Sequence, residues 1–81
     1  MPKKTAADIE LLKKVGERIK KLRQQSHYAN YEVFAHEKNI SRSQVYRYEK
    51  GTDDLQLTSL IKIIRALEIT PSEFFKDFDS W

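Results

Sequence analysis

Four side chains suited to contacting nucleic-acid bases follow one another within a short predicted helix: Arg42, Ser43, Tyr46 and Arg47. Residues three and four apart are neighbours on a helix, so these side chains share one face. Arginine can donate two hydrogen bonds to O6 and N7 of guanine, which discriminates between bases by ~1–3 kcal/mol. A tyrosine ring can pack against a thymine methyl group or a sugar while its hydroxyl reaches a phosphate. This face therefore predicts base contacts in a major groove.

Positive charge is concentrated in the first two-thirds of the chain. Residues 1–51 hold 12 Lys and Arg against 6 Asp and Glu, whereas residues 52–81 hold 3 against 6. A basic region of this kind attracts phosphate groups. Because an ordinary solvated helix surface can have the same balance, the charge supports nucleic-acid binding only together with the helix pattern.

Few residues are available for other chemistry. The absence of cysteine removes disulfides, thiolate nucleophiles and Cys-ligated zinc. His27 and His36 have no carboxylate or histidine partner at ligand spacing, and the serines at 41 and 43 have no neighbouring base. We expect no enzymatic activity, no metal site and no cofactor.

A length of 81 residues is sufficient for one hydrophobic core, so we expect a single domain over residues 1–81. No apolar run is long enough to span a membrane, and the N-terminal segment lacks the apolar stretch of a secretory signal. A chain without cysteine suits a reducing compartment. We therefore expect a cytoplasmic protein with no membrane contact.

Capping residues and apolar periodicity predict five helices and no strand. The first begins at the cap Thr5, with Asp8 three residues on as in a capping box, and runs to about Gln25 along one apolar stripe: Ile9, Leu12, Val15, Ile19 and Leu22. The second follows the N-cap Asn30 and ends near Lys38, with a predicted buried face of Val33, Phe34 and Ala35. The third begins at Ser41, turns Val45 and Tyr48 inward, and ends at Gly51, a preferred residue after a helix.

The last two helices are predicted after an acidic loop at 52–54. The apolar stripe of the fourth consists of Leu57, Leu60, Ile61, Ile64 and Leu67. The run from Thr70 to Glu73 combines a capping box with proline at the first helical position. It predicts a fifth helix that extends through Phe74, Phe75 and Phe78.

Residues 30–50 have the layout of a helix-turn-helix unit. The small side chain of Ala35 allows the third helix to cross the second closely. Ile40 and Val45 would fill the crossing, and Asn39 tolerates the left-handed conformation that the turn needs. The third helix can then project its outer face into a groove ~12 Å wide.

The segment from Gly16 to Phe75 resembles the lambda-repressor-like family, also called the Cro/C1 or XRE type. Four stretches carry the resemblance: RIKKLR at 18–23, VFA at 33–35, ISRSQVYRYEKG at 40–51, and residues 60–75. It implies a compact all-α domain of five helices, here with an extended first helix. It also implies a sequence-specific transcriptional regulator, expected to be a repressor, that binds palindromic double-stranded DNA as a homodimer and reads it with the helix 41–49.

The resemblance also implies residue roles. Base contacts fall on Arg42, Ser43, Tyr46 and Arg47. Phosphate contacts fall on Asn30, Tyr31, Ser41 and Lys50. An ion pair between the first helix and the end of the third falls on Arg23 and Glu49.

Some positions depart from the family pattern. Tyr31 replaces a glutamine that contacts phosphate, and Tyr46 replaces a common serine and enlarges the recognition surface. Asn39 and Glu68 stand at usual glycines, which implies a strained or altered turn at Glu68. The acidic loop at 52–54 would weaken phosphate contact there, and the segment 26–30 lacks the customary glycine.

Both ends extend beyond the resemblance, with a helical extension at 5–15 and an aromatic extension at 76–81. The two extensions either pack on each other within one chain or form a two-fold interface. The candidate interface residues are Ile9, Leu12, Phe78 and Trp81. Such an interface would place two recognition helices ~34 Å apart on successive major-groove turns.

A second class of function is an interaction module that uses the same fold to bind a protein partner, as an antitoxin-like protein or a co-activator does. The aromatic residues motivate it: positions 74, 75, 78 and 81, with tyrosines at 28, 31 and 46. Salt dependence separates the two classes, because groove binding weakens steeply with salt and an aromatic protein interface does not.

Overall fold

The computed structural model describes residues 4–52 and 54–78, which contain five α-helices and no strand. The helices are α1 (Ala6–Gln25), α2 (Tyr31–Glu37), α3 (Arg42–Lys50), α4 (Leu57–Ala66) and α5 (Pro71–Phe74). The predicted all-α class with five helices is confirmed. Within the described residues, none of these helices has the length and apolar character needed to cross a membrane.

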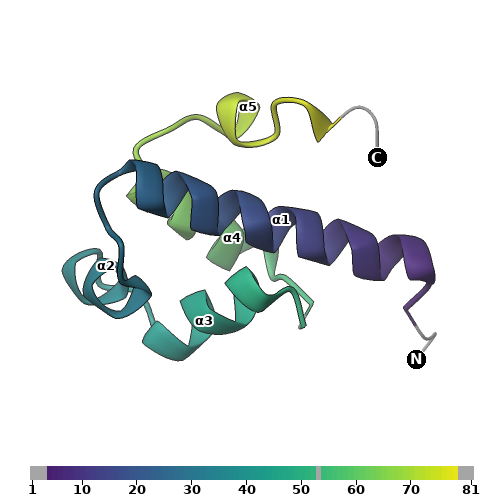
Figure 1. The fold of residues 1–81 in the computed structure, drawn as a ribbon, viewed down its shortest axis with the longest axis horizontal. Helices are drawn as coiled ribbons and strands as arrows, with labels where there is room; N and C mark the ends of the chain where they lie inside the picture. Colours follow the sequence, from purple (N-terminus) through teal and green to yellow (C-terminus); the bar gives the residue numbers. More distant parts are fainter. Residues whose placement is uncertain (1–3, 53, 79–81) are drawn as a thin grey trace.

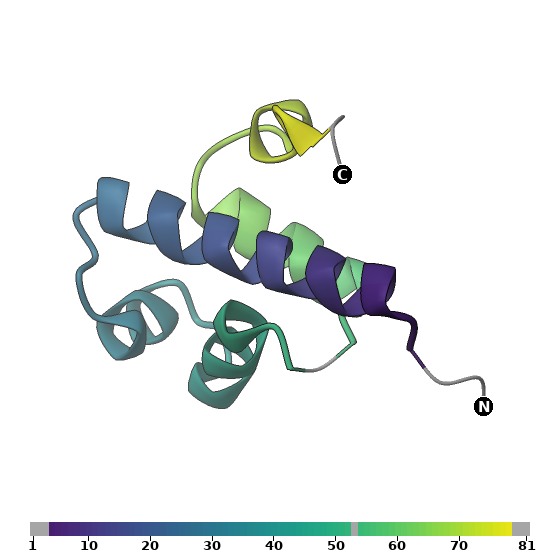
Figure 2. The same ribbon diagram turned by 45° about the vertical axis from the view of Figure 1, so that its right-hand side comes forward.

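The long helix α1 runs through the middle of the molecule (Figure 1). The α2–α3 pair lies on one side of α1, and α5 lies on the opposite side in both ribbon views (Figures 1 and 2). Helix α4 runs behind α1 (Figure 2). This arrangement leaves the side of α2 and α3 that faces away from α1 open to solvent.

Two helix starts form the capping boxes that the sequence predicts. At α1, the Thr5 hydroxyl accepts from the Asp8 backbone N–H at 3.1 Å, and the Asp8 carboxylate accepts from the Thr5 backbone N–H at 3.0 Å. At α5, Thr70 and Glu73 make the same reciprocal contacts. Each box satisfies N–H groups that have no partner within the helix.

The core is built from all five helices and the turn that follows α5: its buried apolar residues are Val15, Ile19, Phe34, Ala35, Val45, Tyr48, Leu60, Ile63, Ile64, Leu67, Phe74 and Phe78. Two apolar residues that the pattern placed on buried faces are exposed instead, Val33 by 49% and Leu57 by 73%. Each residue turns a helix by about 100°, so Val33 faces away from the core when Phe34 and Ala35 face it. In α4 the buried stripe includes Ile63, which the pattern missed, and Leu57 is exposed at the first position of the helix.

The fifth helix is shorter than predicted, because it ends at Phe74 instead of reaching Phe78. Arg18 of α1 donates from Nη1 to the Phe74 carbonyl at 3.2 Å and from Nη2 to the Lys76 carbonyl at 2.8 Å. Asp77 has a φ of +71° and turns the chain back. Phe78 then packs in the core, with the Arg18 guanidinium carbon 5.0 Å from its ring centroid.

Left-handed residues end four of the helical segments. Gly51 (φ +70°) follows α3, and Asn39 (φ +56°) and Glu68 (φ +61°) occupy the turns where the family resemblance implies glycine. His27 (φ +71°) makes the corresponding turn after α1. A side chain in this conformation is strained, most of all one without the local hydrogen bonding of asparagine.

Replacing Glu68 with glycine is expected to raise the free energy of unfolding by ~0.5–1 kcal/mol. The left-handed conformation costs a residue with a Cβ atom ~1–2 kcal/mol, and the greater freedom of glycine in the unfolded chain offsets part of this gain. The contact that is lost, Lys38 Nζ to Glu68 Oε2 at 3.9 Å, is exposed and weak. Urea denaturation measures the change, with Glu68→Ala as the control that loses the carboxylate and keeps the strain.

Candidate nucleic-acid interface

Hydrogen bonds define the starts of α2 and α3 and the turn between them. Asn30 Oδ1 accepts from the Glu32 backbone N–H at 2.7 Å, and Ser41 Oγ accepts from that of Gln44 at 3.3 Å. In the turn, the Ile40 backbone N–H donates to the Ala35 carbonyl at 2.9 Å. Together with the left-handed Asn39, these bonds determine the direction in which α3 leaves α2.

Two further contacts tie α3 to the segment 56–66. Gln44 Nε2 donates to Ser59 Oγ of α4 at 3.1 Å, and the buried Tyr48 hydroxyl accepts from the Gln56 backbone N–H at 3.2 Å. Side chains on the inner face of α3 are thus held by the core and by polar contacts. Its outer face is left available for a ligand.

Helix α3 lies unusually close to α1 at Gly16. A Cβ atom built on Gly16 would lie 2.5 Å from the Tyr48 carbonyl oxygen and 2.6 Å from that of Glu49. At the end of α3, a Cβ atom on Gly51 would lie 2.9 Å from the Leu12 carbonyl oxygen. The sequence indicated that Gly51 ends a helix. It gave no direct indication that Gly16 allows α1 and α3 to approach, apart from the presence of a glycine inside a strongly predicted helix.

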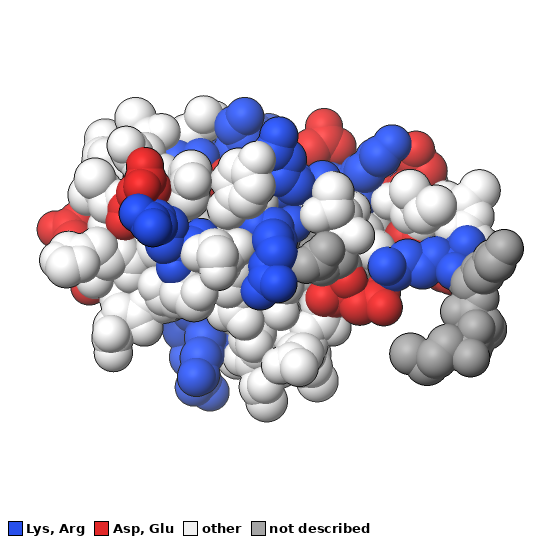
Figure 3. All heavy atoms as spheres, turned by 90° about the horizontal axis from the view of Figure 1, so that it is seen from below, with Lys and Arg blue, Asp and Glu red and all other residues white. Residues whose placement is uncertain are grey.

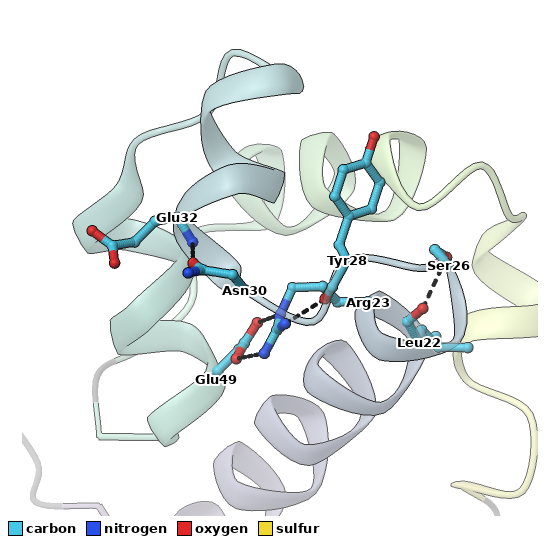
Figure 4. Close-up of polar contacts among 7 residues, drawn as sticks. All are labelled: Leu22, Arg23, Ser26, Tyr28, Asn30, Glu32 and Glu49. Atoms are coloured by element: carbon cyan, nitrogen blue, oxygen red, sulfur yellow. Dashed lines mark hydrogen bonds and ion pairs between the residues drawn. The ribbon is translucent and has the colours of Figure 1, made fainter.

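Arg23 and Glu49 form a buried ion pair between α1 and α3 (Figure 4). Arg23 donates from Nε to Glu49 Oε2 at 2.7 Å and from Nη2 to Oε1 at 3.0 Å. Its Nη1 donates to the Tyr28 carbonyl at 2.6 Å. A single guanidinium therefore joins α1, the loop before α2 and the end of α3. This is the pair that the family resemblance implies.

The four candidate base-contact residues lie on the exposed outer face of α3: Arg42, Ser43, Tyr46 and Arg47. Val45 and Tyr48 lie on the opposite face, in the core. Figure 3 shows the molecule from the side of α2 and α3, where several blue Lys and Arg side chains lie among uncharged white ones and cover more of the central surface than the red Asp and Glu do. The structure thus places an arginine-bearing helix face within a basic surface.

The ring of Tyr31, the first residue of α2, packs on the ring of Tyr46 in α3. Their ring centroids are 5.4 Å apart at an interplanar angle of 43°, and Lys50 Nζ lies 5.4 Å from the Tyr46 centroid. Beside these rings is a hollow of about 260 Å³ whose lining residues are Lys20, Arg23, Tyr31, Tyr46, Glu49 and Lys50. Its two exposed lysines come from α1 and α3, and Lys20 was not among the residues predicted from the sequence.

Arg42 makes a contact that the sequence did not predict. Its Nη1 donates to Glu32 Oε2 at 2.9 Å, which joins the first turn of α3 to the first turn of α2. The two residues are ten apart and on different helices, so no helical spacing could indicate this pair. The arginine predicted to contact bases therefore has a carboxylate partner within the protein.

The candidate interface residues at the chain ends have different environments. Ile9 is 43% exposed and Leu12 is half-buried, so both are partly accessible on α1. Phe78 is buried within its own chain, which favours the alternative of packing inside one chain for this residue. Trp81 lies outside the described residues. Within the described part of the chain, no three His, Asp or Glu side chains gather in a group that could hold a metal ion.

Comparison with known proteins gives two matches and one negative result. A family model described as helix-turn-helix matches residues 19–74, which include α2, the turn and α3 in full. The control protein C.MunI of Mycoplasma sp is 34% identical over 64 residues, which cover 79% of this chain and 86% of that protein. No solved structure gives a significant match.

Proposed function

Since the chain belongs to the Cro/C1-type helix-turn-helix family and is a DNA-binding transcriptional regulator, we propose that it reads duplex DNA by inserting α3 into the major groove. The observation that carries this proposal is the exposed outer face of α3, with its two arginines. The inner face is held against α1, α2 and α4. A helix supported in this way can enter a groove without losing its own packing.

In this proposal the outer face of α3 contacts base edges through Arg42, Ser43, Tyr46 and Arg47. The proposed phosphate contacts are Asn30, Tyr31, Ser41 and Lys50. The hollow beside Tyr46 supports the placing of Lys50, because two lysines there can face one backbone segment. Tyr31 can offer its hydroxyl to a phosphate while its ring remains packed on Tyr46.

We propose that the protein acts in the cytoplasm as a repressor and binds a palindromic operator as a homodimer, with residues 1–81 as one domain. A two-fold dimer presents its recognition helices ~34 Å apart, which matches successive major-groove turns. The resemblance to the lambda-repressor-like family supports repression, and the relative named a control protein supports a regulatory role. The partly exposed Ile9 and Leu12 of α1 are candidates for the dimer contact.

Selection of bound duplexes from a random pool tests the proposal directly. We expect an enriched motif with two-fold symmetry and half-sites separated by about one helical turn. A motif without symmetry would contradict the homodimer, and the absence of any enriched motif would contradict sequence-specific binding. A reporter placed behind the selected operator then distinguishes repression from activation.

Arg42→Ala and Arg47→Ala are each expected to reduce the preference for one base pair per half-site by ~1–3 kcal/mol. Lys50→Ala is expected to weaken binding to all sequences equally and to lower the dependence of affinity on salt. Titrations of the operator and of single-base variants at two salt concentrations measure both effects. If both arginine variants kept the wild-type preferences while folded, the assignment of base contacts would be wrong.

The alternative of a protein-interaction module receives little support from its aromatic residues. Phe74 and Phe78 are buried, and Phe75, Tyr28 and Tyr31 are partly buried against the core. Most of the aromatic side chains that motivated this alternative therefore stabilise the domain instead of forming an exposed surface. Tyr46 is 45% exposed, but it lies on the outer face of α3, with Lys50 beside its ring.

A further inference from the structure

We infer that Glu32 is a specificity-determining residue, which positions Arg42 for guanine and lowers the affinity for DNA of every sequence. This inference rests on the proposed function, because it assumes that Arg42 contacts a base. It adds a residue of α2 to a recognition surface otherwise assigned to α3. The group that Arg42 would recognise is the edge of a guanine base in the major groove.

The backbone of Glu32 is fixed at the start of α2. The Glu32 backbone N–H donates to the side chain of Asn30 at 2.7 Å, which fixes the first turn of α2. Figure 4 shows the Glu32 carboxylate extending away from the Arg23–Glu49 pair, so the two acidic groups act separately. Glu32 Oε2 then accepts from Arg42 Nη1 at 2.9 Å.

Arg42 retains the donors that it needs for guanine while it is paired. A guanidinium has five N–H donors, and two suffice for O6 and N7 of guanine. The Arg42 and Glu32 side chains are 69% and 48% exposed, so the pair lies at the surface where a base would arrive. A flexible arginine that is already oriented loses less conformational freedom on binding.

The charge of Glu32 has a second effect. Phosphate groups of the DNA repel a carboxylate, so Glu32 weakens binding to every sequence. A guanine opposite Arg42 compensates through two hydrogen bonds, whereas other base pairs do not. Repulsion lowers the affinity for all sequences alike and leaves the ratio of specific to non-specific affinity unchanged, whereas the orientation of Arg42 raises that ratio.

The test compares Glu32→Ala, Glu32→Gln and the wild type in duplex selection and in titrations of the selected operator. We expect Glu32→Ala to lower the guanine preference at one pair per half-site by ~3–10-fold, and to raise affinity for unrelated DNA by ~2–5-fold at low salt. Glu32→Gln keeps an acceptor for Arg42 without the charge. It should therefore raise the affinity for unrelated DNA as much as Glu32→Ala does, but retain most of the guanine preference.

Glu37→Gln is the matched control, because it removes one negative charge from an exposed position on the same helix. Its guanine preference should equal that of the wild type. The thermal midpoints of the Glu32 variants should stay within about 3 °C of the wild type, because an exposed ion pair contributes little to stability. This comparison separates positioning from a structural role.

The arginine side-chain N–H signals in the NMR spectrum of the free protein provide a readout without DNA. We expect Arg42 Nε to become more mobile in Glu32→Ala than in the wild type. Unchanged mobility, or a guanine preference equal to that of the wild type, would overturn the inference. If Arg42→Ala alters the preference and Glu32→Ala does not, only the role of Glu32 fails; if neither alters it, the proposed base contact fails as well.

Discussion

Replacing Glu49 with alanine is expected to lower the free energy of unfolding by ~3–5 kcal/mol, because it leaves the Arg23 guanidinium buried without its carboxylate. The two side chains are only 4% and 9% exposed, so water cannot take the place of the missing partner. A domain of this size has a total stability of about 5–15 kcal/mol. We therefore expect a large fall in the urea midpoint and in the thermal midpoint.

The double variant Arg23→Met/Glu49→Leu separates the burial of a charge from the contribution of the pair. Apolar residues of similar volume avoid the cost of desolvating two ions, so the double variant should be much more stable than Glu49→Ala. The Tyr28 carbonyl loses its donor in this variant, which limits the recovery. A loss of less than ~1 kcal/mol in Glu49→Ala would show that the pair behaves as an exposed one.

The matched control for this experiment is Glu37→Ala, which removes an exposed glutamate from α2. Surface substitutions of this kind usually change stability by less than ~0.5 kcal/mol. The contrast between the two glutamates isolates the effect of burial.

Gly16→Ala is expected to destabilise the protein by ~2–3 kcal/mol, although alanine favours helix more than glycine does. Inside an exposed helix this substitution stabilises by ~0.5–1 kcal/mol. Here the new methyl group would lie 2.5 Å from the Tyr48 carbonyl oxygen and 2.6 Å from that of Glu49. Both atoms belong to the backbone of α3, so relief requires the two helices to move apart, which costs packing energy.

Urea denaturation of Gly16→Ala measures this effect, and Glu17→Ala on the exposed side of α1 is the control. The control changes helix propensity next to the same site without approaching α3. A stabilised Gly16→Ala variant would show that α1 and α3 can separate at no cost. In the expected case, operator affinity also falls, because α3 is displaced from the position in which α2 and α4 support it.

Helix positions were largely predictable from the sequence. Thr5 with Asp8, Thr70 with Glu73, and the serine at position 41 form the caps that their spacing indicates. These contacts join residues at most three apart, so the local chain determines them. The errors occurred at Val33, Leu57 and Phe78, where the rotation of a short helix or the packing of another element decides which side is buried.

The candidate recognition face was predictable for a related reason. Helical spacing places Arg42, Ser43, Tyr46 and Arg47 on one side, and the buried Val45 and Tyr48 on the other. Their partners on other helices were not predictable. Arg42 pairs with Glu32, and Tyr46 packs on Tyr31, because the turn at Asn39 sets the angle between α2 and α3.

The sequence by itself therefore determined the five helices, their starts and the residues on the outer face of α3, because interactions within one helical turn govern all three. Only the tertiary structure decided three other features. These are the close approach of α1 and α3 at Gly16, the end of α5 at Phe74, whose carbonyl accepts from Arg18, and the pairing of Arg42 with Glu32. Each of these depends on where one helix crosses another. That geometry is set by the packing of the whole core around left-handed turns, and no local pattern of residues contains it.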